Sequence, residues 1–421
     1  MLETLRRIWK IESLRKSILF VIGMLVIFRA AAHIPIPGVD PVGLRQLLDG
    51  NQILGLLNVF SGGTIENFSI VMLGVAPYIT SSIIFQLLVM VVPRLEELQK
   101  EGESGQQKIN MYTRLTSVPL AILQAFALIR LLQSTGGVIG DIATFQWVAM
   151  ITAVTAGTVF LMWIGELITE KKIGNGISLL IFAAIVAALP TTVQNIIVNY
   201  NPADLPTYIM FLIVAVITVV GVVIITEGQR NIPISYARQV RGRAAAGMKN
   251  HLPLRINMAG VIPIIFAISV VLFPPMIAQF FVNDPGFGGS VSRAIVTWFN
   301  NQLIYGILYF LLVFGFTYFY TAVIFRPEKM AENLQRQGAF IPGIRPGKQT
   351  EEYLKKTMTR LVFSGALFLA LIAVLPLIVQ AFTHSQILAV GGIGLLIVVS
   401  VAIEIAKQVE AQLTMHQYDR V

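Results

Sequence analysis

The sequence predicts an all-α integral membrane protein with ten transmembrane helices. Of its 421 residues, 55% are hydrophobic and only 13% are charged, whereas soluble domains carry about 25% charged residues. The mean hydropathy is +0.75, and together these values exclude a water-soluble globule. The charged residues also leave long uncharged intervals, and each bilayer crossing by a helix takes roughly 20 apolar residues.

The expected helices follow the intervals that lack Asp, Glu, Lys and Arg. The last interval, between Arg360 and Glu404, holds 43 uncharged residues, which suits two helices joined by a turn near residues 383–385. The first interval begins after residue 16 and extends past Arg29 if this side chain reaches the membrane surface. The remaining intervals are 66–94, 114–130, 141–166, 172–204, 204–227, 255–284 and 293–326.

The basic residues orient the chain. With a cytoplasmic N-terminus, 27 of the 31 Lys and Arg residues fall on the cytoplasmic side, as the positive-inside rule requires. Both termini are then cytoplasmic, because the number of spans is even. Two cytoplasmic loops, 227–255 and 326–360, are long and basic, and each could project as a hairpin or a helical finger. We interpret them as docking sites for an acidic partner or RNA; the alternative is that they only fix the topology.

One apolar segment is too short to cross the membrane. The run Ile53–Phe60 is followed by Ser61-Gly62-Gly63-Thr64, and about ten residues cannot span a bilayer. Residues 52–69 are therefore predicted to form a re-entrant half-helix that protein or a water-filled cavity shelters. A loop on the outer surface is the alternative.

The apolar intervals lack the groups of an enzyme or an ion-coupled transporter. Cysteine is absent and the four His residues are scattered, so no metal, cofactor or catalytic constellation is expected. Ion-coupled transporters place charged residues in mid-membrane, and here the charged residues fall near the ends of the spans. The polar side chains Gln86 and Asn257 are weak candidates singly, because such groups usually join helices. Pro77 and Pro263 are expected to kink the helices that contain them.

Two isoleucine pairs point to an uncharged constriction. Ile79 and Ile83 are four residues apart, as are Ile177 and Ile181, so each pair shares one face of a helix. Apolar constrictions can gate a pore by dewetting. From spacing alone, isoleucines that pack in the core or face lipid remain the simpler interpretation.

Five strings of residues resemble the SecY family, the pore-forming subunits of the bacterial protein translocon. Residues 74–86, GVAPYITSSIIFQ, are similar to the second transmembrane helix of that family. The other strings follow in the family's order, at 101–105, 173–178, 251–263 and 338–347. The resemblance runs from the N-terminal amphipathic helix through the last span.

The resemblance implies two pseudo-symmetric, inverted five-helix halves, residues 1–200 and 201–421, hinged at the outer loop near residues 199–206. It also implies a ring of aliphatic side chains at the constriction of an hourglass-shaped channel. Such a ring closes around an extended peptide of any sequence and offers ions no ligand. Carried over by motif, the ring residues are Ile79, Ile83, Ile177, Ile181, Ile265 and Ile397.

The resemblance further implies a plug, a lateral gate and a docking site. The plug, at about residues 54–67, would lie under the ring on the outer side and swing away when a chain enters. The gate would lie between the second and third spans on one half and the seventh and eighth on the other, lined by Gln86 and Asn257. The plug residues are Leu54, Leu57, Phe60, Gly62, Gly63 and Asn67, with the two glycines supplying flexibility. The docking residues are Arg345 first, then Arg241, Arg243 and Arg255.

The function implied by the resemblance is passive conduction without enzyme activity or cofactor. Unfolded preproteins would cross the bacterial plasma membrane, and transmembrane segments would leave laterally into lipid. The implied partners are SecE, SecG, the motor ATPase SecA, the ribosome with its RNA and protein, signal sequences, nascent preproteins and membrane lipid. The driving force would come from the ribosome, SecA or the membrane potential.

Two other functions fit parts of the sequence. A secondary transporter of a small solute would also have ten spans in inverted halves. An RNA-binding membrane anchor would account for the pI of about 9.7. The lack of charge in mid-membrane and the two large basic loops favour the protein-conducting channel.

Overall fold

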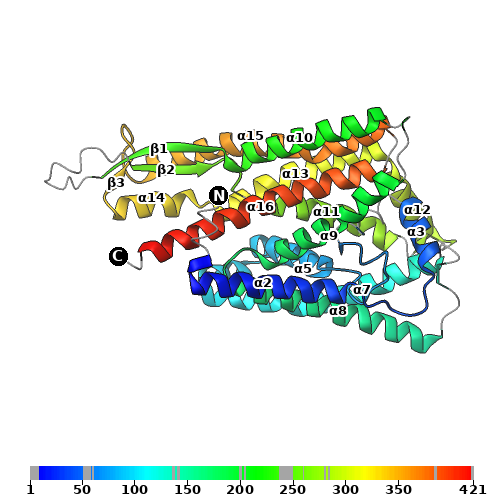
Figure 1. The fold of residues 1–421 in the computed structure, drawn as a ribbon. Helices are drawn as coiled ribbons and strands as arrows, with labels where there is room; N and C mark the ends of the chain where they lie inside the picture. Colours follow the sequence, from blue (N-terminus) through cyan, green and yellow to red (C-terminus); the bar gives the residue numbers. More distant parts are fainter. Residues whose placement is uncertain are drawn as a thin grey trace.

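The computed structural model describes residues 9–50, 58, 61–134, 138–139, 143–198, 202, 205–236, 250–258, 260–278, 281–282, 285–383 and 386–418. Long helices run side by side in one elongated bundle (Figure 1). Helix α14 (Pro327–Arg336) and the C-terminus lie at one end of this bundle. The short helices α3 (Pro41–Gly50) and α12 (Phe287–Asn300) lie at the opposite end.

The described residues contain ten long apolar helices, one for each expected span. They are α2 (Glu12–Ala31), α5 (Ala76–Val91), α7 (Glu103–Ser134), α8 (Thr144–Glu170), α9 (Gly176–Val198), α10 (Leu205–Glu227), α11 (Ile262–Ala278), α13 (Gln302–Ile324), α15 (Lys348–Thr383) and α16 (Gln386–Tyr418). By length and composition, α7, α8, α10 and α15 each qualify as membrane spans, as does the stretch Gln302–Arg336 that contains α13 and α14. α5 qualifies together with α6 (Pro93–Lys100), to which it is bent by 98°. The final uncharged interval divides between α15 and α16, where the turn was predicted.

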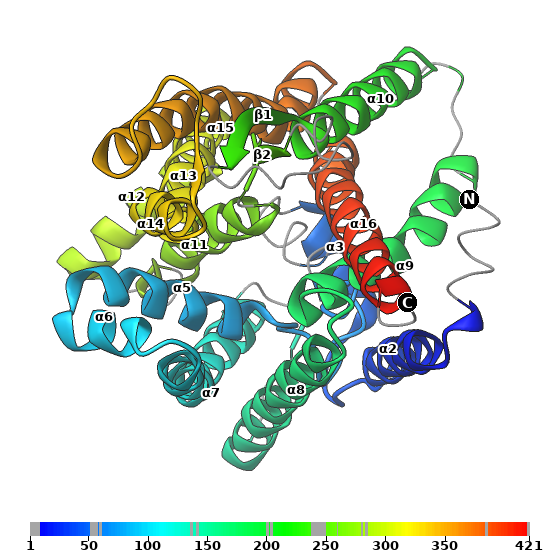
Figure 2. The same ribbon diagram turned by 90° about the vertical axis from the view of Figure 1, so that its left-hand side faces the viewer.

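The helices pack in two groups that follow the chain. In the N-terminal group, α7 contacts α5 and α8, and α2 contacts α8 and α9. In the C-terminal group, α13 contacts α11 and α15, and α16 contacts α10 and α15. The groups meet along two seams: α11 lies against α5 and α7, which we call the front seam, and α16 lies against α9, which we call the rear seam. The end-on view shows the blue-to-cyan helices below and the yellow-to-red helices above (Figure 2).

Two prolines begin helices, so the kinks predicted for them are wrong. α5 begins at Ala76 with Pro77 in its first turn, and α11 begins at Ile262 with Pro263 as its second residue. The first N–H groups of a helix have no partner within the helix. Proline, which lacks an N–H, is therefore tolerated there without bending the axis.

A small sheet joins the two long basic loops. Strands β1 (Gln229–Tyr236) and β2 (Asn250–Arg255) pair in antiparallel fashion, so the first loop has the hairpin arms that were one of its two predicted forms. Strand β3 (Ala339–Phe340), from the second loop, pairs with the end of β1, which gives the order β2-β1-β3. This sheet is an addition to the predicted all-α fold.

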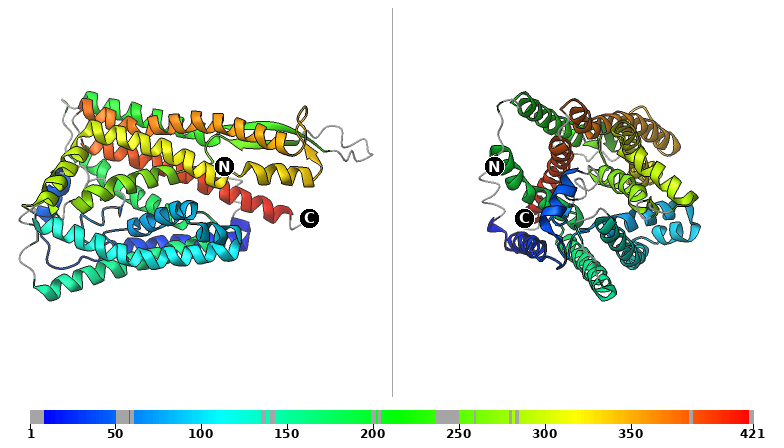
Figure 3. Two further views of the ribbon diagram at one scale, coloured as in Figure 1. Left: turned by 180° about the vertical axis from the view of Figure 1, so that it is seen from behind. Right: turned by 90° about the vertical axis from the view of Figure 1, so that its right-hand side faces the viewer.

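The sheet and its neighbours share a hydrophobic core of their own. We call β1, β2, β3, α14 and the first turns of α15 the sheet unit. Its core contains Ile232 of β1, Leu254 of β2, Leu334 of α14 and Leu354 of α15. The view from behind shows that the sheet unit projects beyond the helices at the end where the C-terminus lies (Figure 3).

Candidate channel and its closure

The six predicted ring isoleucines come from four helices of both groups. Ile83, Ile181, Ile265 and Ile397 are buried, with exposed fractions of 0–6%, and Ile79 is 8% exposed. These five belong to one hydrophobic cluster, against which the partly buried Ile177 packs. The fold thus brings into one core residues from α5, α9, α11 and α16 that are far apart in the sequence.

Two cavities lie on either side of this cluster. The larger, about 590 Å³, is lined by Ile79, Ile177 and Ile265 together with polar side chains. The smaller, about 70 Å³, is lined by Ile79, Ile181 and Ile265. Ile79 and Ile265 therefore line both cavities and lie at the boundary between them.

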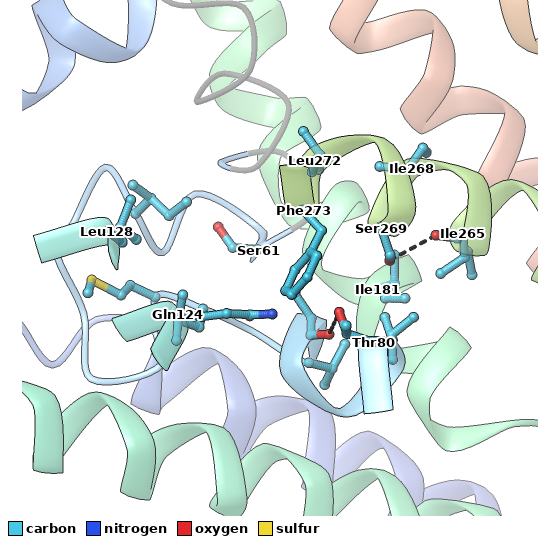
Figure 4. Close-up of a pocket in the computed structure, with 16 residues that line it drawn as sticks. Ser61, Thr80, Gln124, Leu128, Ile181, Ile265, Ile268, Ser269, Leu272 and Phe273 are labelled. Atoms are coloured by element: carbon cyan, nitrogen blue, oxygen red, sulfur yellow. Dashed lines mark hydrogen bonds between the residues drawn. The ribbon is translucent and has the colours of Figure 1, made fainter. Parts of the chain in front are cut away.

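The small cavity is almost entirely apolar. Gln124 and Leu128 of α7 line one side, and Leu272 and Phe273 of α11 line the other (Figure 4). Ser61, Ile65 and Met72 complete the lining from the segment before α5. This segment, residues 61–75, closes the small cavity where the plug was predicted.

Residues 61–75 form turns whose side chains are largely buried. Thr64, Ile65, Phe68 and Met72 are each at most 3% exposed, which contradicts the alternative of an outer surface loop. Asn67 is exposed. Asn58 and Ser61 are helical, and residues 62–68 are turns or a bend. The rest of the run predicted as a half-helix, including the plug residues Leu54, Leu57 and Phe60, lies outside the described residues.

Two side-chain contacts hold the first part of residues 61–75. Arg29 of α2 donates a hydrogen bond from Nη1 to the carbonyl oxygen of Gly62, at 2.9 Å. Arg45 of α3 forms an ion pair with Glu66, with 2.9 Å between Nε and Oε1. Gly62 adopts a φ of +79°, and a Cβ atom at this position would lie 2.6 Å from the Cβ of Ala184 on α9. Gly62 therefore permits close packing as well as the unusual backbone conformation.

The later part of the same segment, from Phe68 to Ile70, is held by its backbone. The amide of Ile36 donates to the carbonyl of Phe68 at 2.8 Å, and the amide of Ile70 donates to the carbonyl of Ile34 at 3.1 Å. A Cβ atom on Gly157 of α8 would lie 2.0 Å from the carbonyl oxygen of Ile70. The first part of this segment is held by the contacts of Arg29 and Arg45 and by the hydrogen bond from the Gly63 amide to the carbonyl of Asn58, at 2.8 Å.

The large cavity is polar and opens toward the end that carries α6. Arg114 of α7 and Glu166 of α8 form an ion pair in its wall. Glu103, Glu170 and Asn110 also line the cavity. Sequence reasoning missed this pair, although Arg114 begins the third uncharged interval and Glu166 ends the fourth. Because α7 and α8 are antiparallel neighbours, the two positions meet at the same end of the bundle.

Of the two predicted gate residues, Gln86 lies in α5 and Asn257 precedes α11, and each donates a hydrogen bond within its own segment. Gln86 lines the large cavity, and its Nε2 donates to Ser82 Oγ one turn earlier, at 3.1 Å. Asn257, which precedes α11, is 7% exposed, and its Nδ2 donates to the carbonyl of Gly260 at 3.1 Å. The Oδ1 atom of Asn257 has no hydrogen-bond partner among the described residues. An unpaired buried acceptor is costly, so this amide is poorly satisfied in the present arrangement.

Two of the predicted docking residues, Arg345 and Arg255, lie in or beside the sheet unit. Arg345 is exposed in the loop between β3 and α15, and its carbonyl oxygen accepts a hydrogen bond from Thr350 Oγ1 at 3.0 Å. Arg255 is exposed at the end of β2. Arg241 and Arg243 lie outside the described residues. Across the described part of the chain, no group of three or more His, Cys, Asp or Glu side chains could hold a metal ion.

The fold and these cavities define a membrane channel in which apolar side chains separate two cavities. The family model described as SecY matches residues 69–406. The protein translocase subunit SecY of Streptomyces coelicolor is 41% identical over the whole chain and 99% of that relative. The protein of the same name from Escherichia coli K12 is 42% identical over 96% of this chain and 93% of that relative. The chain therefore belongs to the SecY family.

Solved structures show the same fold at lower sequence identity. A structure described as a protein conducting channel matches with a TM-score of 0.65 and 17% identity, over 93% of this chain and 91% of that chain. A second, from work on the plug domain of the SecY protein, matches with a TM-score of 0.63 and 19% identity over the same shares.

Proposed function

We propose that this chain is the pore-forming subunit of a protein translocon. It conducts unfolded preproteins across the bacterial plasma membrane and releases apolar segments laterally into lipid. One observation carries the proposal: Ile79 and Ile265 separate a polar cavity from an apolar one, and residues 61–75 close the apolar side. The relatives at about 41% identity bear the name of protein translocase subunits, which supports the same function.

The isoleucine ring accounts for closure of the channel by apolar side chains alone. Aliphatic side chains offer no oxygen to replace the hydration shell of an ion, and a narrow apolar passage empties of water. The same side chains change rotamers readily, so the ring adapts to whichever residue of an extended peptide passes. The six isoleucines at positions 79, 83, 177, 181, 265 and 397 act together in this role.

The segment at residues 61–67 acts as the plug. An entering chain displaces it after the hydrogen bond from Arg29 to Gly62 and the ion pair from Arg45 to Glu66 break. The backbone contacts of Phe68 and Ile70 keep the rear of the segment in place. The plug therefore moves as a flap that remains attached before α5.

The front seam acts as the lateral gate. It separates α5 and α7 from α11 and α13, and Gln86 and Asn257 contribute polar groups beside it. Because Asn257 Oδ1 is unpaired in the closed arrangement, opening this side costs little hydrogen bonding. A hydrophobic signal sequence then competes by offering apolar contact to α5 and α11.

The sheet unit is the docking site, and Arg345 is its central residue. The chain hydrolyses nothing itself, so SecA, the ribosome or the membrane potential drives transport. One structure with this fold is described as Sec61 in a canine ribosome–channel complex, with a TM-score of 0.63. That description supports a ribosome as a docking partner. The basic residues predict that the sheet unit and both termini are cytoplasmic.

The two helix groups correspond to halves 1–200 and 201–421, hinged near residues 199–206. SecE and SecG brace them from outside. The apolar face of α10 suits a partner helix, because Leu212, Val216 and Val220 are more than half exposed to the surroundings. Such a face packs against another helix or against lipid.

Reconstitution tests this function against the small-solute transporter. Proteoliposomes containing the chain with SecE and SecG should import a preprotein when SecA and ATP are added. A stalled nascent chain should crosslink to a photoreactive residue placed at Ile83 or Ile181, whereas Leu212 on the outer face of α10 is the matched control. Solute counterflow without preprotein import would overturn the proposal.

A further inference from the structure

Among the described residues, two side-chain hydrogen bonds cross between the helix groups, one at each seam. On the front side, Arg326 Nη2 donates to Gln99 Oε1 at 3.0 Å. On the rear side, Gln412 Nε2 donates to the carbonyl oxygen of Lys172. Both lie toward the end of the bundle that carries α6 and the sheet unit, where the large cavity opens.

The front bond joins the ends of helices that face each other across the gate. Gln99 lies in α6, the short helix that follows α5 after a bend of 98°. Arg326 lies between the last residues of α13 and the start of α14, where it is the N-cap residue. Glu96, on the same helix as Gln99, interacts electrostatically with Arg326 while it pairs with Lys100. The guanidinium thus meets a face of α6 that carries an amide oxygen and a carboxylate.

Arg326 also adjoins the core of the sheet unit. Its neighbour Phe325 is 9% exposed and belongs to the core of the sheet unit, together with Leu334 of α14. Because a hydrogen bond weakens steeply beyond about 3.2–3.5 Å, a small displacement of α14 is enough to break the contact with Gln99. A displacement of the sheet unit therefore affects α6 through the side chain of Arg326.

We propose that the Arg326–Gln99 hydrogen bond is a clasp that positions the front seam in its closed state. A partner that docks on the sheet unit opens the clasp by moving α14. The proposal rests on the lateral gate and the docking site of the proposed function. Both residues are positioning residues, because they act on the seam and not on the transported chain.

Two substitutions should shift the gate in opposite directions. Arg326→Gln removes the charge-assisted bond and should raise the import of a preprotein with a weakened signal sequence by about threefold to tenfold relative to the intact preprotein. Gln99→Glu converts the bond into an ion pair and should lower the same ratio. The matched control is Arg336→Gln, which removes a cation from the same helix α14 that bonds only Glu332 one turn earlier, at 2.6 Å. A shift of both variants in one direction, or no difference from the control, would overturn the clasp.

Crosslinking provides a second arm, because the chain has no cysteine. Gln99→Cys with Arg326→Cys, bridged by a bismaleimide, should block lateral insertion of a transmembrane segment. Lys172→Cys with Gln412→Cys, bridged at the rear seam, should leave insertion intact. Adding SecA should lower the bridging yield at the front seam and leave the rear yield unchanged.

Different results would overturn the proposed function and the Arg326–Gln99 clasp. If the unbridged double-cysteine protein imports no preprotein while the unmodified chain also imports none, the proposed function fails. If the unbridged protein is active and its bridged form inserts segments equally well, the clasp alone is wrong.

Discussion

We expect individual side chains to decide whether the channel is closed. Ile79 and Ile265 line both cavities, so a smaller side chain at either position should connect the two spaces. Arg29 fixes the carbonyl of Gly62, and Gly62 fits only because it has no Cβ atom to meet Ala184. The flexibility expected of Gly62 is thus combined with tight packing, while a Cβ on Gly63 would meet nothing within 4 Å.

Replacing Ile79, Ile181 and Ile397 together by Gly should make the resting channel leak ions. The substitutions remove the apolar side chains that exclude water, at the additional cost of roughly 1 kcal/mol per glycine in a helix. Conductance across a planar bilayer measures the leak. Leu at the same three positions conserves volume and should keep the bilayer tight, and background conductance in the glycine variant would refute the ring.

Arg29→Gln should loosen the plug. It removes a hydrogen bond from a charged donor, a contact worth about 1.5–3 kcal/mol, so brief openings should become more frequent in single-channel records. Arg130→Gln is the control, because Arg130 is an exposed arginine that donates, within the described part of the chain, to Gln133 one turn away. Equal opening rates in the two variants would remove Arg29 from the plug mechanism.

Arg345→Glu should abolish SecA-driven import while the channel remains folded. The substitution reverses the charge at an exposed site. The local turn is held by the backbone carbonyl of Arg345 and not by its side chain. SecA binding and import are measured side by side, with thermal unfolding as the control for folding. Normal import would exclude Arg345 from docking.

Among the elements, the sheet unit departs most from the expectation. The ten helices follow from uncharged intervals of sufficient length, and the hairpin arms of the first loop were one of two predicted forms. The pairing of β1 with β3 was not predictable, because β3 has only two residues, Ala339 and Phe340, and its partner lies far away in the sequence. Pro77 was misplaced for a related reason: an uncharged interval does not mark where a helix begins.

The candidate site was predicted only in part. The apolar isoleucines and the buried segment before α5 could be assigned, because composition and the resemblance to the SecY family both pointed to them. The Arg114–Glu166 pair and the contacts of Arg29, Arg45 and Arg326 could not be assigned. Each joins residues of different segments, and the partners are set by how these segments pack and not by local sequence.

Leu254→Ala or Leu354→Ala should loosen the sheet unit without opening the helix bundle. Both side chains are 0% exposed in its core, and such truncations cost about 2–5 kcal/mol. Hydrogen exchange of residues 229–236 should accelerate in either variant. Leu371→Ala on the outer face of α15, where Leu371 is 51% exposed, should leave that exchange unchanged; a uniform acceleration would contradict an independent core.

At the scale of the whole molecule, the ends of the bundle differ in character. One end carries the sheet unit, the polar cavity and most of the basic residues, and the other carries α3 and α12. Phe287 and Trp298 of α12 are 86% and 64% exposed, as aromatic side chains at a membrane interface often are. We therefore expect the molecule to adopt one orientation in the bilayer.

Single cysteines should report that orientation. Gln349→Cys, exposed at the start of α15, should react with an impermeant maleimide only from the cytoplasmic side. Ser290→Cys, exposed on α12, should react only from the outer side. Sealed right-side-out and inverted vesicles provide the two arms, and the reverse pattern would show that the positive-inside assignment is wrong.

The shared sheet also has a consequence for biogenesis. During synthesis β1 and β2 emerge first, and β3 follows only after α11, α12, α13 and α14 have been made. A nascent copy therefore holds an incomplete sheet with an unpaired edge on β1 until these helices have been inserted, and contacts between distant segments form late. We therefore expect the proposed docking surface to be complete only after α11, α12, α13 and α14 have been made.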